Sequence, residues 1–191
     1  MQTTDSFTTV LFVGGESRRM GADKATLLFD DEPLWSRQLR TLRELSPEKL
    51  LISARTKPPW CPPEIETVLD LPPSRGPLSG LAATLKKTTT THLLVLAVDM
   101  PWMTSAHLRW LQSRSVPGVG VMPVLRGHCE PLGAIYPLES SGLAQSALSG
   151  DDVSMNSFIA KLRQKKILRD CEIDAGRAKF YHNANTPEDL L

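Results

Sequence analysis

The sequence predicts an α/β fold in which an open, mostly parallel sheet carries helices on both faces. Short apolar runs alternate with segments of helical periodicity along the first two thirds of the chain. Several of these runs lead directly into glycine or aspartate, as expected where parallel strands end at a ligand-binding edge. The 191 residues can bury a substantial core, and we expect a single domain over residues 1–191.

The first predicted strand covers residues 8–13 (TTVLFV), which are rich in β-branched and aromatic residues. A glycine-rich loop follows it directly. Further strands are predicted over 49–53, 66–70, 92–98 and 120–124. Helices are predicted between them over 33–45, 77–87 and 104–113. This order makes each helix a crossover between parallel strands.

Two helical segments have an apolar stripe that fits packing on the sheet, because its residues recur at steps of three and four. The first stripe consists of Leu78, Leu81, Ala82 and Leu85. The second consists of Met155, Phe158, Ile159 and Leu162. The second stripe begins after Ser154, a favourable N-cap residue, so we expect a helix to start there.

Charge and cysteine content narrow the class of protein. With 22 basic and 21 acidic residues the formal net charge is +1, so we expect no nucleic-acid partner and no membrane-surface partner. Three widely spaced cysteines predict neither a disulfide framework nor a zinc site. The longest apolar run, residues 93–98, is too short to span a bilayer, and no signal peptide opens the chain. We therefore expect a soluble, cytoplasmic protein.

The stretch VGGESRRMGADK at residues 13–24 predicts an anion-binding loop. Its glycines are Gly14, Gly15 and Gly21, and its cations are Arg18, Arg19 and Lys24. Glycines let backbone amides approach a phosphate closely, and the cations offset charge on a polyphosphate. The loop is neither a P-loop nor a GxGxxG motif. The alternative interpretation is a solvated turn with incidental basic residues.

Two aspartates end predicted strands near this loop. Asp99 closes an apolar strand just before Met100 and Pro101, and Asp70 closes the strand over 66–70. A carboxylate near phosphates suits Mg²⁺, which usually takes one or two protein carboxylates and completes its shell with phosphate and water. The alternative for Asp99 is a turn residue before proline, and Asp70 has the same alternative. The segment RGPLSG at 75–80 predicts a helix N-terminus that would favour an anion or a polar ligand edge.

Five motifs resemble those of the molybdenum cofactor guanylyltransferase family, in the same order and spacing. They are FVGGESRRMGADK at 12–24, RGPLSGL at 75–81, VDMP at 98–101, EPLGAIYP at 130–137 and NANTPEDL at 183–190. The resemblance implies a three-layer, Rossmann-like nucleotidyltransferase fold. It also implies transfer of GMP from GTP to molybdopterin, or its molybdenum-bound form, with release of pyrophosphate and formation of the guanine dinucleotide cofactor.

The resemblance also assigns roles to residues on the nucleotide side. Phe12, Val13, Gly14 and Gly15 match the strand end and loop that line the nucleotide, and Asp70 matches an aspartate on the same side. Lys24 matches the lysine that holds the nucleotide phosphates, and Lys24 and Asp99 both belong to the implied nucleotide site. Catalytic roles at the reacting phosphates fall to Arg19, Lys24 and Asp99. Asp99 matches the ligand of Mg²⁺, for which Mn²⁺ is an alternative.

On the acceptor side, Asn183 and Asn185 match an asparagine pair that binds the pterin. The implied substrates are therefore GTP and molybdopterin, and the implied protein partners are molybdoenzymes or other cofactor-synthesis proteins. The asparagine that the family places after the second strand has no clear counterpart in ISAR at 52–55, and Ser53 stays outside the predicted site.

The chain departs from the family pattern at three positions of the loop. Phe12 and Val13 replace a Leu-Ala pair, and Glu16 adds an acid to a loop that binds anions. Two alternatives follow. The first is a CTP-dependent molybdopterin cytidylyltransferase, since the base is read largely by backbone groups. The second is a catalytically inactive accessory protein of the same fold that binds a nucleotide or the cofactor.

Overall fold

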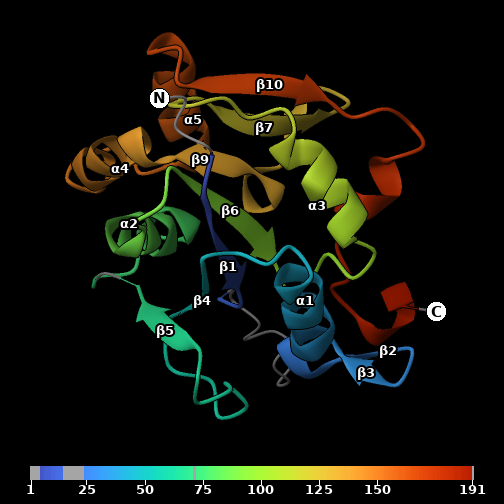
Figure 1. Cartoon of the computed structure of the whole chain (residues 1–191). Coiled ribbons are helices and arrows are strands. Elements are labelled where there is room, and N and C mark those ends of the chain that lie inside the picture. Colours follow the sequence, from blue (N-terminus) through green and yellow to red (C-terminus); the bar gives the residue numbers. More distant parts are fainter. Residues whose placement is uncertain (1–4, 15–23, 71, 191) are drawn as a thin grey trace.

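The computed structural model describes residues 5–14, 24–70 and 72–190. Within these residues, eight strands form one sheet in which the order β10, β7, β9, β6, β1, β4, β5 runs across the molecule and β8 pairs with β7 (Figure 1). The strands are β1 (Phe7–Phe12), β4 (Lys49–Ala54), β5 (Glu66–Leu69), β6 (His92–Ala97), β7 (Gly120–Leu125), β8 (His128–Cys129), β9 (Ile135–Pro137) and β10 (Leu168–Glu172).

The sheet is mostly parallel, which confirms the sequence prediction. β1 is parallel to β4 and β6, β4 is parallel to β5, and β7 is parallel to β10. Only β9 and the short β8 run antiparallel to their neighbours within the described residues. Phe12 pairs with Ser53 on one side and Ala97 on the other, so the three central strands end level with one another.

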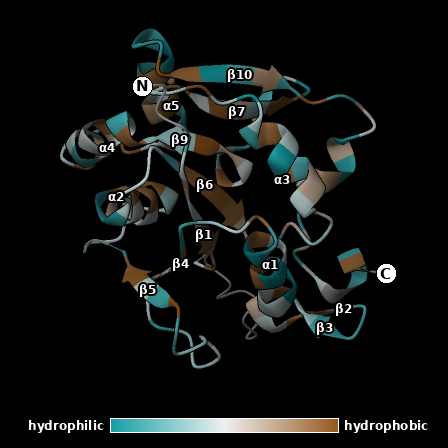
Figure 2. Cartoon of the chain, viewed as in Figure 1, coloured by the Kyte–Doolittle hydropathy of each residue, from teal (hydrophilic) through white to brown (hydrophobic). Residues whose placement is uncertain are grey.

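Helices cover both faces of the sheet, as the sequence predicts (Figure 1). They are α1 (Leu34–Arg43), α2 (Pro77–Lys87), α3 (Ser105–Gln112), α4 (Ser141–Leu148) and α5 (Met155–Gln164). Strand residues alternate between the two cores: Val10 of β1 packs with α2, α4 and α5, and Leu11 packs with α1 and α3. β6 is buried along its whole length and is coloured as hydrophobic in Figure 2, as expected for a strand covered on both faces.

Both stripes predicted from periodicity face the core. Leu78, Leu81 and Leu85 of α2 are buried, as are Phe158 and Leu162 of α5. The predicted N-cap is confirmed, because the Ser154 side-chain oxygen accepts a hydrogen bond from the Ser157 amide at 3.2 Å. Side-chain capping therefore starts α5 where the pattern placed it.

Several short elements were not predicted from the hydrophobic periodicity of the sequence. They are the hairpin of β2 (Leu28–Phe29) and β3 (Glu32–Pro33), the antiparallel strands β8 and β9, helix α4 and the edge strand β10. Strands of two or three residues are too short to show a repeat, and β10 (LRDCE) exposes most of its residues. No helix in the described part of the chain is long and apolar enough to cross a membrane.

The chain after β10 returns to the carboxyl edge of the central strands. Two short 3-10 turns, Ala178–Tyr181 and Pro187–Leu190, frame this last segment, whose end lies beside β2 and β3 (Figure 1). A third 3-10 turn, Lys24–Thr26, lies near the start of α1. This arrangement brings residues from both ends of the sequence to one edge of the sheet.

Candidate functional site

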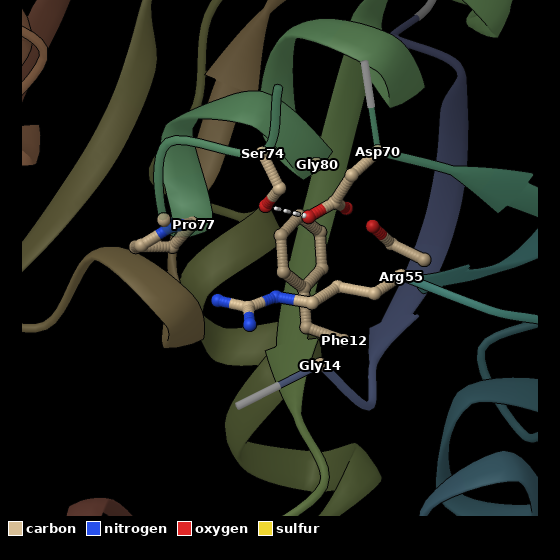
Figure 3. Close-up of a pocket in the computed structure, with 9 residues that line it drawn as sticks. Phe12, Gly14, Arg55, Asp70, Ser74, Pro77 and Gly80 are labelled. Atoms are coloured by element: carbon tan, nitrogen blue, oxygen red, sulfur yellow. Dashed lines mark hydrogen bonds between the residues drawn. The ribbon is translucent and has the colours of Figure 1, made fainter. Parts of the chain in front are cut away.

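A pocket of about 370 Å³ opens at the carboxyl ends of β1, β4 and β5. It is lined by Phe12, Gly14, Ser53, Arg55, Asp70, Ser74, Gly76, Pro77 and Gly80. Figure 3 shows the side chains of Phe12 and Arg55 facing the same space, with the Ser74 hydroxyl turned toward the Asp70 carboxylate. The pocket lies at the sheet edge where open α/β folds bind ligands.

Gly80, in the first turns of α2, keeps the floor of this pocket open. A β-carbon at position 80 would lie 2.6 Å from Ser53 Oγ, 3.0 Å from Asp70 Oδ1 and 3.1 Å from the Phe12 ring. Glycine is otherwise unfavourable inside a helix, by roughly 1 kcal/mol relative to alanine. The close approach of three side chains gives the physical reason for it here.

The loop between β5 and α2 fixes the rim of the pocket. The Ser74 hydroxyl donates to Asp70 Oδ2 at 2.7 Å, which leaves Oδ1 on the side of Gly80. Gly76 has a positive φ of 77°, a conformation that favours glycine, and Pro77 occupies the first turn of α2. The sequence RGPLSG therefore builds a helix N-terminus that faces the pocket.

A second group of polar side chains lies at the end of the neighbouring strand β6. Lys24 Nζ donates to Asn185 Oδ1 at 2.6 Å and lies 3.8 Å from Asp99 Oδ2. The Ala184 amide donates to the Asp99 carbonyl oxygen at 2.8 Å. The chain leading to Asp99 follows β1 directly, since the Val98 amide donates to the Phe12 carbonyl at 2.9 Å. The pocket and this polar group therefore share one edge of the sheet.

The electrostatics of Asp99 reflect its partial burial. Desolvation raises the pKa of the Asp99 carboxyl, and the nearby Lys24 ammonium opposes that shift. The Asp99 and Lys24 side chains are 24% and 28% exposed, so a ligand can still reach both. A further positive charge at this place would favour the ionised carboxylate.

The structure brings most of the sequence-predicted residues into these two groups. Phe12, Gly14 and Asp70 line the pocket, and Lys24, Asp99 and Asn185 form the polar group.

The other predicted site residues that the structure describes belong to neither the pocket nor the polar group. The Val13 amide donates to the Ser53 carbonyl at 3.0 Å, while the Val13 side chain packs toward the core of α1 and α3. Asn183 is exposed, next to the buried Ala184. The predicted site residues Gly15 and Arg19 lie outside the described residues, as do Glu16, Arg18 and Gly21 of the same loop.

Six pocket residues are absent from the predicted site residues: Ser53, Arg55, Ser74, Gly76, Pro77 and Gly80, of which the last three lie in the segment RGPLSG that the sequence predicts as a helix N-terminus favouring a ligand. Ser53 and Arg55 follow the same rule as Asp70, because they lie where a parallel strand ends. Gly80 carries the signal of an isolated glycine inside a helical pattern, which often marks a close approach. Ser74 has no such signal, since its role depends on the turn that brings it to Asp70.

Comparison with known proteins identifies relatives of this chain. The family model described as MobA-like NTP transferase domain matches residues 9–166. A protein of Opitutus terrae named "probable molybdenum cofactor guanylyltransferase" is 35% identical over 182 residues, which cover 94% of this chain and 90% of that protein.

Solved structures share the fold at lower identity. Molybdopterin-guanine dinucleotide biosynthesis protein A of Archaeoglobus fulgidus superimposes with a TM-score of 0.70 at 20% identity, covering 96% of this chain and 94% of the other. A nucleotidyl transferase from Methanothermobacter gives a TM-score of 0.72 at 14% identity, with 97% and 94% covered. With the family model matching residues 9–166, the chain belongs to the MobA-like NTP transferase family.

Proposed function

We propose that this protein transfers GMP from GTP to molybdopterin, releases pyrophosphate and so forms the molybdopterin guanine dinucleotide cofactor. The observation that carries the proposal is the placement of the Asp70 pocket beside Lys24, Asp99 and Asn185 on one sheet edge. Transfer of a nucleotidyl group needs such an arrangement, with a base pocket, a cation at the phosphates and a place for the acceptor. The name of the Opitutus relative supports the choice of GTP and molybdopterin.

The pocket favours guanine over cytosine on chemical grounds. Ser74 occupies Asp70 Oδ2, and Oδ1 remains beside Gly80 to accept hydrogen bonds from a base. Guanine presents adjacent N1–H and N2 amino donors, whereas cytosine and adenine place a ring acceptor beside their amino group. An acceptor-only carboxylate repels that ring acceptor. The Asp70 carboxylate therefore favours a guanylyltransferase over the cytidylyltransferase alternative.

The reaction needs no covalent intermediate on the enzyme. The terminal phosphate oxygen of molybdopterin attacks the α-phosphorus of GTP, the bond between that phosphorus and the β-phosphate bridging oxygen breaks, and pyrophosphate leaves with the electron pair. In this proposal Lys24 offsets the charge that develops on the phosphates. Arg19 shares this role, on the resemblance of its loop alone. Asn185 and Asn183 bind the acceptor.

The donor set at Asp99 fits a magnesium ion. Asp99 supplies one partly exposed carboxylate at a strand end, and Mg²⁺ usually takes one or two carboxylates together with phosphate oxygens and water. Asp99 would hold the ion, and Mn²⁺ accepts the same oxygen ligands. When bound, the ion supplies positive charge that polarises the phosphates.

Nucleotide-dependent thermal stabilisation is the first test. A ligand at one hundred times its dissociation constant adds about 2.7 kcal/mol. For a chain of this size, that corresponds to a rise in Tm of roughly 5–10 °C. We expect this rise with GTP and Mg²⁺ or Mn²⁺, and little with CTP or ATP. Pyrophosphate release from GTP in the presence of molybdopterin then tests the transfer itself.

The other outcomes of this experiment identify the alternatives. A rise with CTP alone, followed by CTP-dependent turnover, would establish the cytidylyltransferase. Binding of GTP without pyrophosphate release at saturating molybdopterin would indicate a nucleotide-binding accessory protein. No stabilisation by any nucleotide would contradict the proposal altogether.

The proposal also covers the cellular compartment in which the protein acts and the proteins that it contacts. We infer action in the cytoplasm, where cofactor synthesis would proceed under reducing conditions, and the free Cys61, Cys129 and Cys171 agree with such a compartment. We also infer contact with molybdoenzymes that receive the product, or with proteins that supply molybdopterin. Co-purification of the protein with a cofactor-free molybdoenzyme would test the first contact.

A further inference from the structure

We propose that Tyr181 and Asp189 are positioning residues that fix the C-terminal arm, defined here as residues 181–190, so that Asn185 holds Lys24 beside Asp99. Neither Tyr181 nor Asp189 would touch the substrates. Each acts through the backbone that presents Asn185. The inference rests on the proposed function only for its kinetic readout, because the position of the arm can be measured without turnover.

The first anchor is buried and lies at the start of the arm. Tyr181 and His107 are each 3% exposed, and the Tyr181 hydroxyl lies 2.8 Å from His107 Nε2. The Tyr181 ring also closes on Gly133, where a β-carbon would lie 3.0 Å from Tyr181 Cε1. The Tyr181 ring thus has little room to move, and its hydroxyl ties the arm to α3.

The chemistry of this anchor keeps it neutral at physiological pH. Burial, with the Arg177 charge as a smaller cause, lowers the pKa of His107 to about 4. Burial also raises the pKa of the Tyr181 hydroxyl, so the phenol stays protonated. Within the described residues His107 Nδ1 has no hydrogen-bond partner. The imidazole therefore depends on Tyr181 for its polar contact, and loss of the hydroxyl leaves both nitrogens unsatisfied.

The second anchor lies beyond Asn185 and is exposed to solvent. Asp189 Oδ2 accepts hydrogen bonds from the Asn185 amide at 2.7 Å and from the Thr186 amide at 2.8 Å. These two backbone donors lower the pKa of the Asp189 carboxyl. The carboxylate fixes the turn from which the Asn185 side chain projects.

Between the two anchors, the arm contacts Asp99 and Lys24, the residues proposed to act at the reacting phosphates. The fully buried Ala184 donates its amide to the Asp99 carbonyl, and Asn185 Oδ1 accepts the 2.6 Å hydrogen bond from Lys24 Nζ. A shift of the arm would lengthen both contacts. The pocket around Asp70 and Gly80 shares no residue with the arm, so recognition of the base should be spared, and GTP should be affected only through the contact of Lys24 with its phosphates.

Tyr181→Phe tests the first anchor, because it removes one oxygen and keeps the ring. We expect kcat to fall and the KM for molybdopterin to rise, for a combined loss of about tenfold or more in kcat/KM. The KM for GTP should change less than the KM for molybdopterin, because the base pocket is intact and only the Lys24 contact with the phosphates is altered. Steady-state kinetics with each substrate varied in turn separates these effects.

Tyr136→Phe is the matched control. Tyr136 is fully buried on the other face of the sheet, and its hydroxyl donates to the Pro131 carbonyl at 2.9 Å. This variant loses the same atom from a partly buried hydrogen bond, and we expect near wild-type kinetics for both substrates. If Tyr181→Phe and Tyr136→Phe give the same kinetic change, Tyr181 is merely structural and the proposal fails.

Asp189→Ala tests the second anchor without disturbing the core, since Asp189 is exposed. We expect the same split between the two substrates as for Tyr181→Phe. Asp189→Asn should recover part of the loss, because the amide oxygen can still accept a backbone hydrogen bond. Wild-type kinetics in Asp189→Ala would overturn the role of this residue.

Amide hydrogen exchange provides a readout that does not depend on activity. The amides of Ala184 and Asn185 should exchange faster in Tyr181→Phe and in Asp189→Ala than in wild type, and remain protected in Tyr136→Phe. Unchanged exchange in both arm variants would refute the inference even in an active enzyme. Faster exchange in an enzyme that transfers no GMP would instead refute the proposed function and keep the positioning role.

Discussion

Gly80 and Asp99 show how single residues determine which ligand groups the site can admit and bind. The pocket exists because position 80 carries no β-carbon between Ser53, Asp70 and Phe12. Asp99 lies where β6 ends, close enough to Lys24 for a charge contact and open enough for a ligand. In both cases one substitution changes the chemistry without removing the surrounding packing.

Gly80→Ala should weaken GTP binding with little change in stability. The added methyl group would fall 2.6 Å from Ser53 Oγ and intrude on the pocket floor. Alanine is the better helix former by roughly 1 kcal/mol, which offsets part of the crowding. We expect at least a tenfold rise in the Kd for GTP by titration calorimetry, about 1.4 kcal/mol. Gly142→Ala in α4, where the β-carbon meets nothing within 4 Å, is the control and should bind GTP normally.

Asp99→Asn should lower kcat strongly while the protein stays folded. The amide removes the negative charge that faces Lys24, but the backbone carbonyl that accepts from Ala184 remains. We expect a loss in kcat of at least about a hundredfold, the size typical of a lost electrostatic contact at a reacting centre. Turnover at wild-type rate in Mg²⁺ would contradict the assignment of Asp99 as the metal ligand.

Secondary-structure elements place these side chains through their ends. Thr104 caps α3 by accepting from the His107 amide at 3.2 Å, and Ser154 caps α5 in the same way. The α3 cap lies on the element that anchors the C-terminal arm, whereas α5 packs far along the sheet toward β10. Helix α3 therefore affects the position of site residues, whereas helix α5 contributes to stability away from the site.

Ser154→Ala should lower stability and leave activity unchanged. Loss of an N-cap costs about 1 kcal/mol, which thermal denaturation would register as a fall in Tm of roughly 2–4 °C. Ser146→Ala is the control. The Ser146 hydroxyl donates to the Gly142 carbonyl inside α4, so its removal should leave Tm unchanged or slightly higher. Reduced turnover in Ser154→Ala would show that α5 influences the site.

At the scale of the whole molecule, two hydrophobic cores lie on opposite faces of one sheet, and buried ionisable groups adjoin one of them. The core of α1 and α3 adjoins His107 and Tyr181, which fasten the C-terminal arm to the rest of the protein. The pKa values of buried groups therefore bear on the stability of the entire fold.

Stability should fall with acidification because of His107. Its pKa is about 4 in the folded protein, against 6.5 for an unperturbed histidine, so only the unfolded chain takes up the proton between these values. The free energy of unfolding therefore decreases as the pH falls from 6.5 to 4, by up to about 3 kcal/mol. Burial raises the carboxyl pKa values of Asp99 and Glu130, and these groups act in the opposite sense.

The variant His107→Gln separates the effect of His107 on the pH dependence of stability from the effects of Asp99 and Glu130. The variant is less stable throughout because the stacked ring is lost, but the difference in unfolding free energy from wild type should shrink on acidification. Denaturant titrations of both proteins at several pH values measure this difference. A constant difference from pH 4 to 7 would contradict a low pKa for His107.

Local patterns in the chain were enough to predict the central strands, helices α1, α2, α3 and α5, and the polar residues at strand ends. Each depends on hydrophobic period, capping or glycine content within a few residues, and Phe12, Gly14 and Asp70 accordingly line the pocket. The antiparallel strands β8 and β9 were missed because segments of two or three residues carry no measurable period.

The sequence by itself determined the class of fold, the carboxyl edge as the place of the site and the family resemblance, since all three are written in contiguous motifs. Tertiary structure alone decided which of these motifs meet. Lys24 and Asn185 are 161 residues apart in the chain and 2.6 Å apart in space, and Gly80 gains its role only where Ser53 and Asp70 converge on it. Such contacts depend on how the helices and the returning C-terminal arm pack on the sheet, which no local pattern encodes.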